Sequence, residues 1–187
     1  SVGAHIVDTS GLTLGSLTLF NNTDGLKLDS ITNVQIGESV GVMDIYDNDK
    51  GIHFFGSNDS FLSYEEYSSE HSFIWNNTAN LFFVGSNNNT ITGFTITNAS
   101  VAGINLTGGS TNNLFYNNNI SDNTVNAQDT LSNFWNTSKS SGTNIIGGSN
   151  LGGNYWGDYL GADTTGDGIG DNATPHTSNS GITGGNG

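Results

Sequence analysis

A repeated unit constrains the fold of this chain more than any other feature of its sequence. Each copy opens with a Gly or Asn and an apolar-x-apolar run, and the openings, 26, 29 and 23 residues apart, lie at Gly25, Gly51, Asn80 and Gly103. An Asn-rich turn follows, and then a closing triplet: Ile31, Val34 and Ile36; Ile91, Phe94 and Ile96; Phe115, Asn118 and Ile120. Self-similarity at this spacing is typical of repeat architectures, in which each unit packs on its neighbours.

The composition of the units indicates strands. Short runs rich in Ile, Phe, Val and Thr are separated by Asn, Gly and Ser, which favour turns and tolerate left-handed backbone angles. No window keeps the period of a helix, so the chain is predicted to be all-β. Units of this length supply three short strands that stack in parallel about 4.8 Å apart around an apolar interior. The prediction is a right-handed parallel β-helix (β-solenoid), whose unit from Gly51 is irregular because its run from Phe61 to Trp75 is longer.

The repeat divides the chain into four parts. Residues 25–126 carry the units. Residues 1–24 have a mostly alternating pattern and an atypical sequence, so they could form the first turn, a cap or an arm that connects to another subunit. Residues 127–175 are predicted to form a loop-rich carboxyl-terminal cap with an acidic, Gly-rich loop, and residues 176–187 a flexible or subunit-linking tail.

Charge and composition exclude several classes of protein. The net charge is −14, with three Lys and no Arg, so nucleic acid is excluded as a partner because phosphate binding needs clustered basic residues. Leu, Ile, Val and Phe make up 45 of 187 residues, enough for a core and too many for a disordered acidic tail. There is no Cys, and no stretch approaches the roughly 20 apolar residues of a membrane span.

Two observations indicate secretion. The chain opens at Ser1 rather than Met, as expected of a mature form after removal of a signal peptide. Nine sequons for asparagine-linked glycosylation are present, although an Asn- and Thr-rich chain also generates sequons by chance. They begin at Asn21, Asn58, Asn76, Asn88, Asn98, Asn105, Asn119, Asn136 and Asn172.

The turns and the carboxyl-terminal segment resemble a known family. The N-x-I/F-x-x-N-x-I turns and GI-x-L openings resemble the NosD-like right-handed β-helix repeats of archaeal and bacterial surface proteins. The run FWNT at 134–137 and the segment GTNIIGGSNLGGNYWGDYLGADTTGDGIGD at 142–171 resemble a cassette that ends such repeats in secreted proteins of methanogenic archaea. The resemblance covers roughly Gly25 to Pro175 and implies an extracellular location. The family usually has Asp where this chain has Thr165.

Asp163, Thr165, Asp167 and Asp171 have the spacing of a calcium loop. Oxygen ligands at alternate positions let a short turn wrap a hard cation, and the intervening glycines permit the bend. The bidentate Glu of an EF-hand is missing, so the expected calcium site is weaker than a sensor loop. The alternative is a solvated Gly-Asp turn.

Tyr155 and Trp156 lie in an aromatic cluster beside that loop. Aromatic faces suit stacking on a sugar ring, but an open solenoid end also needs a cap over its apolar interior. Capping is the favoured interpretation and glycan stacking the alternative.

Catalysis finds little support. Polysaccharide-cleaving β-helices need clustered carboxylates with a Lys or Arg, and the group Asp44, Asp47, Asp49, Lys50 with His53 is the one candidate. The same residues are equally consistent with a solvated polar turn between two units. The other histidines, together with Met43, could suggest copper, but His5, His71 and His176 are scattered rather than spaced as ligands. We therefore expect no enzyme activity and assign no copper site.

These observations predict an extracellular structural protein of the archaeal cell surface that self-assembles into a sheath, surface layer or filament. Its partners would be further copies, joined head-to-tail or edge-to-edge, with calcium offsetting charge where copies meet. The alternative is a surface protein that binds or degrades carbohydrate, with cell-surface glycans as partners and Tyr155, Trp156 and the corner at Asp47 as its site.

Overall fold

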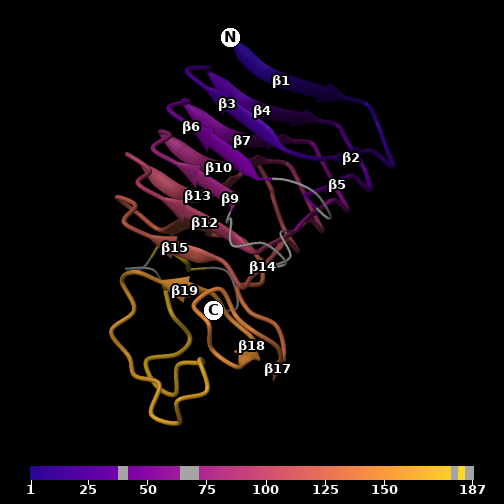
Figure 1. The fold of residues 1–187 in the computed structure, drawn as a ribbon. Coiled ribbons are helices and arrows are strands. Elements are labelled where there is room, and N and C mark those ends of the chain that lie inside the picture. Colours follow the sequence, from indigo (N-terminus) through magenta and orange to yellow (C-terminus); the bar gives the residue numbers. More distant parts are fainter. Residues whose placement is uncertain (38–41, 64–71, 178–180, 184–187) are drawn as a thin grey trace.

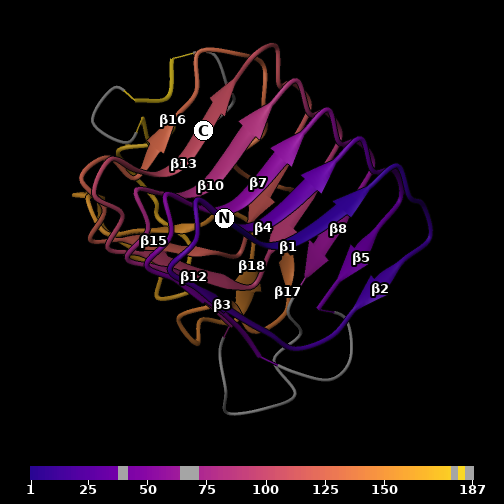
Figure 2. The same ribbon diagram turned by 90° about the horizontal axis from the view of Figure 1, so that it is seen from above.

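The computed structural model describes residues 1–37, 42–63, 72–177 and 181–183. These residues form strands and turns without an α-helix, and parallel sheets stack into a solenoid, which confirms the predicted all-β, right-handed parallel β-helix. Figure 1 shows the turns stacked from the amino-terminal end to a loop-rich carboxyl-terminal end, and Figure 2 shows successive strands, from β1 (Val2–Val7) to β16 (Ala127–Gln128), lying side by side from turn to turn. Within the described residues, no helix has the length and hydrophobicity needed to cross a membrane.

Three parallel sheets form the wall. The first sheet contains β1 (Val2–Val7), β4 (Asp24–Asp29), β7 (Lys50–Phe55), β10 (Ala79–Val84), β13 (Ala102–Thr107) and β16 (Ala127–Gln128). The second contains β2 (Thr13–Leu14), β5 (Gln35–Ile36), β8 (Phe61–Ser63), β11 (Thr90–Thr92) and β14 (Leu114–Tyr116). The third contains β3 (Leu17–Phe20), β6 (Met43–Tyr46), β9 (Ser72–Trp75), β12 (Phe94–Thr97), β15 (Asn119–Ser121) and β19 (Tyr155–Trp156). A separate antiparallel hairpin joins β17 (Ser140–Ser141) and β18 (Asn150–Leu151).

The repeat predicted from the sequence coincides with the turns of the solenoid in the structure. The residues after the four predicted openings, Leu26, Ile52, Leu81 and Ile104, pair directly along the first sheet. All four are fully buried, and Phe54 stacks on Phe83 beside them at 4.2 Å between ring centroids. Register between turns therefore aligns like residues into columns, and the apolar columns fill the interior.

Residues 1–24 form a complete turn of the solenoid. β1, β2 and β3 pair in parallel with β4, β5 and β6. Of the three roles open for this segment, the structure shows the first turn. The irregular unit from Gly51 keeps register on both sides of its long run, because Leu62 pairs with Ile91 and Ile74 with Ile96. Residues 64–71 of that run lie outside the described residues.

Inward-facing Asn and Ser side chains hold the corners. Asn89 Oδ1 accepts the N–H of Ser60, Asn113 Oδ1 accepts that of Asn89, and Asn133 Oδ1 accepts that of Asn113, at 3.0–3.1 Å. The three amides are essentially buried. Each amide pairs with backbone groups of the neighbouring turn that make no hydrogen bond within the sheets. The stacked amides therefore stabilise the contact between successive turns.

Candidate functional site

The carboxyl-terminal end of the solenoid is closed by a cap. β19 adds to β15, which places Trp156 on the column of Ile120. Trp156 is 8% exposed and lies between Trp135, at 5.5 Å between ring centroids, and His176, at 5.0 Å. Trp156 thus covers the apolar interior and has little free face for a sugar, whereas Tyr155 is 42% exposed.

Part of the predicted tail also belongs to this cap. Ile182 is buried and bridges to Asp129, and His176 Nε2 lies 3.0 Å from Asp158 Oδ1. These residues pack on the last turn rather than extending from it. Residues 178–180 and 184–187 lie outside the described residues.

A cavity of about 540 Å³ lies between the last turn and the cap loops. Its walls include Trp135, Tyr155, Trp156, Tyr159, Ile169 and His176. Amide, hydroxyl and amino groups from Asn136, Asn144, Thr137 and Lys139 also line it. A cavity of this size with aromatic walls and a few polar groups has the make-up of a small-ligand site.

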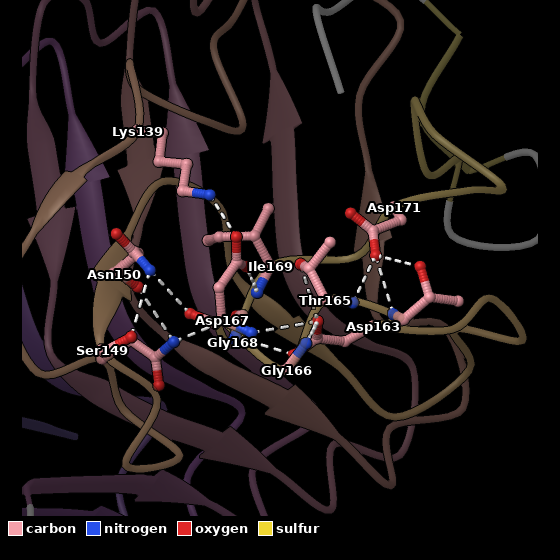
Figure 3. A network of polar contacts seen from close by, with 12 residues as sticks. Lys139, Ser149, Asn150, Asp163, Thr165, Gly166, Asp167, Gly168, Ile169 and Asp171 are labelled. Carbon is pink, nitrogen blue, oxygen red and sulfur yellow. Dashed lines mark hydrogen bonds and ion pairs between the residues drawn. The ribbon is translucent and has the colours of Figure 1, made fainter.

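The predicted calcium loop borders this cavity and is held by its own hydrogen bonds (Figure 3). Asp163 accepts the N–H groups of Gly166 and Gly168, each at 2.7 Å, and that of Asp167 at 3.1 Å. Asp171 Oδ2 accepts the N–H of Thr164 at 2.7 Å and that of Thr165 at 3.0 Å. The carboxylates therefore satisfy the backbone of the loop they belong to.

The third carboxylate of the loop is paired with a lysine. Asp167 Oδ2 contacts Lys139 Nζ, while Asp167 Oδ1 accepts the N–H of Ile169. The hydrogen bond from Lys139 is the largest cause that lowers the pKa of Asp167, and the hydroxyl of Thr164 lowers that of Asp171 in the same way. Among the described residues, no three His, Cys, Asp or Glu side chains are grouped to hold a metal ion. Calcium binding by this loop stays a prediction.

A second polar cluster lies on the outer face of the first sheet. His53 Nδ1 is 3.0 Å and Lys50 Nζ 3.5 Å from Asp24 Oδ1. On the neighbouring strand positions, Lys27 Nζ is 2.8 Å from Asp29 Oδ2. His53 is 9% exposed, and burial lowers its pKa below the ordinary 6.5 against the opposing effect of Asp24.

The catalytic candidates adjacent in sequence are not brought together. Lys50 and His53 meet Asp24, whereas Asp44 lies on the third sheet and accepts a hydrogen bond from Trp75 Nε1 at 2.8 Å. Asp47 is at a corner and accepts from Asn76. Sequence reasoning missed Asp24, although the repeat contains the signal, because the offset of 26 between Gly25 and Gly51 also aligns Asp24 with Lys50.

Copper does not fit the described residues. Copper sites combine imidazole, thiolate or thioether ligands around one point. His5 and His53 are separated in their column by Lys27, and His176 lies at the other end of the solenoid. Met43 is fully buried in the interior. His71 lies outside the described residues.

Comparison with known proteins identifies one family. The family model described as "Periplasmic copper-binding protein (NosD)" matches residues 1–161. No curated protein and no solved structure matches the chain significantly.

Proposed function

This chain belongs to the NosD family, and from that premise we propose that it acts outside the cytoplasm as a surface protein that binds a saccharide in the carboxyl-terminal cavity. The cavity of about 540 Å³ carries the proposal. A sugar ring offers an apolar face of C–H groups and a rim of hydroxyl groups. In the cavity, the rings of Tyr155 and Tyr159 can stack on the apolar face, and the amide of Asn136 and the hydroxyl of Thr137 can bind the hydroxyl groups.

Gly153 allows the proposal to be tested without disturbing the fold. It lines the cavity, and a Cβ built there meets no atom within 4 Å. Gly153→Leu therefore extends a side chain into the space that a ligand would occupy, while Gly153→Ala leaves most of that space open. The two variants form a matched pair at one backbone position.

The experiment screens the purified chain on a glycan array and then measures affinity by calorimetry. We expect a bound saccharide, an affinity reduced at least about tenfold by Gly153→Leu, and an affinity close to that of the parent chain for Gly153→Ala. Absence of any glycan ligand, or equal affinity of both variants, contradicts the proposal.

The proposal includes no catalytic step. Lys50 and His53 both pair with Asp24, Asp44 accepts a hydrogen bond from Trp75, and Asp47 accepts one from Asn76 at a corner. The chain is expected to leave the chain length of any bound polysaccharide unchanged, which size-exclusion chromatography of the ligand after incubation checks.

Self-assembly into a sheath, surface layer or filament is a second candidate, favoured by the opposite end of the solenoid. β1, β2 and β3 are the outermost strands of the three sheets. Beside them, Leu12, Leu14, Leu17 and Leu19 are only partly buried against the core. Strand edges with apolar neighbours accept further strands, so a second copy could add its own turn there.

The cap makes the two modes of assembly distinguishable. Head-to-tail contact would have to displace Trp156 and the cap loops, whereas contact between two amino-terminal ends leaves the cap in place. Light scattering and negative-stain microscopy would show dimers or polymers. A monomer at all accessible concentrations removes the second candidate and leaves the saccharide proposal untouched.

A further inference from the structure

One corner of the solenoid presents a straight column of exposed residues. The column follows the third sheet and consists of Asn21, Asp47, Asn76, Asn98 and Asp122; we call it the corner column. All five are exposed and left-handed, with φ between 55° and 57°. The residues before them pair in register from turn to turn, which fixes the alignment. Asn and Asp are the side chains that most readily adopt this backbone angle.

At four of the five positions the residue after the column residue is Asn, and three of these four Asn side chains make hydrogen bonds between turns at the corner. Asn48 Oδ1 accepts the N–H of Asn22 at 2.9 Å, and Asn77 Oδ1 accepts that of Asn48 at 2.8 Å. The side chains of Asn21 and Asn98 make no hydrogen bond to any described residue. Their outward amides are therefore available for covalent modification. Asp47 adopts the same left-handed backbone angle, so the backbone at this position does not require Asn.

Three of the five column residues begin sequons, and in each both reactive positions are exposed. The hydroxyl residues are Thr23, Thr78 and Ser100, all exposed. A transferase must reach the Asn and the hydroxyl residue two positions later, so exposure of both is the relevant criterion.

Four of the other six sequons fail this criterion, and the two that meet it, at Asn136 and Asn172, lie in the cap outside the corner column. Ser60, in the sequon of Asn58, is 2% exposed, and Thr107, in that of Asn105, donates to the carbonyl of Phe83 at 2.9 Å. Thr90 and Ser121, in the sequons of Asn88 and Asn119, are half-buried. Asn136 lines the cavity, and Asn172 Oδ1 accepts the N–H of Ala162 at 2.9 Å.

We propose that Asn21, Asn76 and Asn98 are asparagine-linked glycosylation sites of this protein and form a row of glycans along one edge of the solenoid. The donor is a polyprenyl-phosphate-linked oligosaccharide. The bond from sugar C1 to the phosphate oxygen breaks, a bond from C1 to Nδ2 forms, and Nδ2 gives up one proton. The Nδ2 of Asn76 keeps one N–H, so its hydrogen bond to Asp47 survives the modification.

A strip of aromatic rings lies immediately beside the row. Phe20 stacks on Tyr46 at 5.2 Å and Tyr46 on Trp75 at 5.0 Å between centroids, and Phe20 is 48% exposed. Phe20 and Trp75 directly precede Asn21 and Asn76. The first sugars of the two glycans lie within reach of this strip and cover apolar surface that the chain leaves open.

The spacing of the turns predicts how the sites influence one another. Asn76 and Asn98 are in adjacent turns, about 4.8 Å apart along the axis, which is close to the thickness of one sugar ring. Asn21 is two turns away from Asn76. Asn76 and Asn98 therefore compete, and Asn21 is modified independently.

The test secretes the whole chain from a host with an asparagine-linked glycosylation pathway and maps all nine sequons by peptide mass spectrometry. We expect glycans on Asn21, Asn76 and Asn98, with double occupancy of Asn76 and Asn98 rarer than chance. Ser100→Ala removes one competing sequon without touching the left-handed Asn and raises occupancy of Asn76. Ser121→Ala, which removes the sequon of Asn119, leaves Asn76 unchanged.

A variant that creates a new sequon in the corner column provides a further test. Asp122→Asn creates a sequon at the same corner, because Asn123 and Thr124 follow, and Thr124 is exposed. We expect this new site to be modified. The proposal is overturned if the three column sites carry no glycan, if Asn105 or Asn119 is modified as fully as they are, or if Asp122→Asn stays unmodified.

Discussion

His53 Nδ1 lies 3.0 Å from Asp24 Oδ1, across two adjacent parallel strands on the outer face of the first sheet. The carboxylate accepts, so Nδ1 carries the proton of the neutral ring. The other ring nitrogen, Nε2, is buried without a hydrogen-bond partner among the described residues. The rings of Phe55 and Phe82 contact the imidazole edge-on.

Stability is expected to fall when His53 becomes protonated. Burial lowers its folded-state pKa below 6.5, so its contribution is fully present above pH 6.5 and is lost as pH falls toward the folded-state pKa. Asp24 opposes this shift, whereas Lys50 and Lys27 reinforce it. Denaturation midpoints between pH 7.5 and pH 5 should decline, and less steeply for His53→Gln.

His5→Gln is the control for that experiment. His5 lies on the same face, but its side chain is 41% exposed. The parent slope should persist in this variant. Equal slopes for the parent chain and His53→Gln would show that the buried ring does not titrate in this range.

Asn113→Ala is expected to destabilise the chain by about 2–4 kcal/mol. The Asn113 side chain is fully buried, accepts the N–H of Asn89 and donates to the carbonyl of Ser86 at 2.9 Å, and alanine leaves these groups unpaired. Asn112→Gly, at an exposed position with φ 58°, should cost under about 0.5 kcal/mol. Urea denaturation of both variants gives the comparison.

Trp156→Ala and Tyr155→Ala test whether Trp156, rather than the neighbouring exposed aromatic residue, caps the apolar interior. Removing the buried Trp156 opens the end of the core, and we expect a loss of about 3 kcal/mol. Tyr155 is 42% exposed, so its replacement should change stability by less than about 0.5 kcal/mol. Similar losses for the two variants would contradict the role of Trp156 as the cap.

The acidic loop is expected to keep its structure without a metal ion. Asp163, Asp167 and Asp171 already accept from backbone groups and Lys139, so a chelator should shift the melting temperature by less than about 1 °C. Addition of millimolar calcium gives the complementary measurement. A clear rise that Asp163→Asn abolishes would show that the loop binds the predicted ion.

The apolar core positions of the solenoid could be predicted from the sequence, but the side-chain contacts between turns could not. Apolar triplets such as Ile91, Phe94 and Ile96 could be read directly, because their period is local and each is fully buried. The pairing of Asp24 with His53 could not be read the same way, since it depends on register between residues 29 positions apart. Aligning the units column by column, rather than reading along the chain, would have found it.

The carboxyl-terminal end was the least predictable part for a related reason. There the chain leaves its repeat, and Asn154 Nδ2 reaches back 39 residues to the carbonyl of Phe115. Such a contact has no periodic signature. The aromatic cluster indicated a cap, but the partners of Trp156, namely Trp135 and His176, became apparent only in three dimensions.

The equivalence of Gly51, Asn80 and Gly103 makes this protein modular. Because β7 and β13 each pair with β10 in the same register, excising residues 80–102 would bring two compatible edges together. Duplicating the same segment would insert a compatible copy. Evolution can thus alter the length of this molecule in whole turns, each adding about 4.8 Å, while the cap and the first turn stay unchanged.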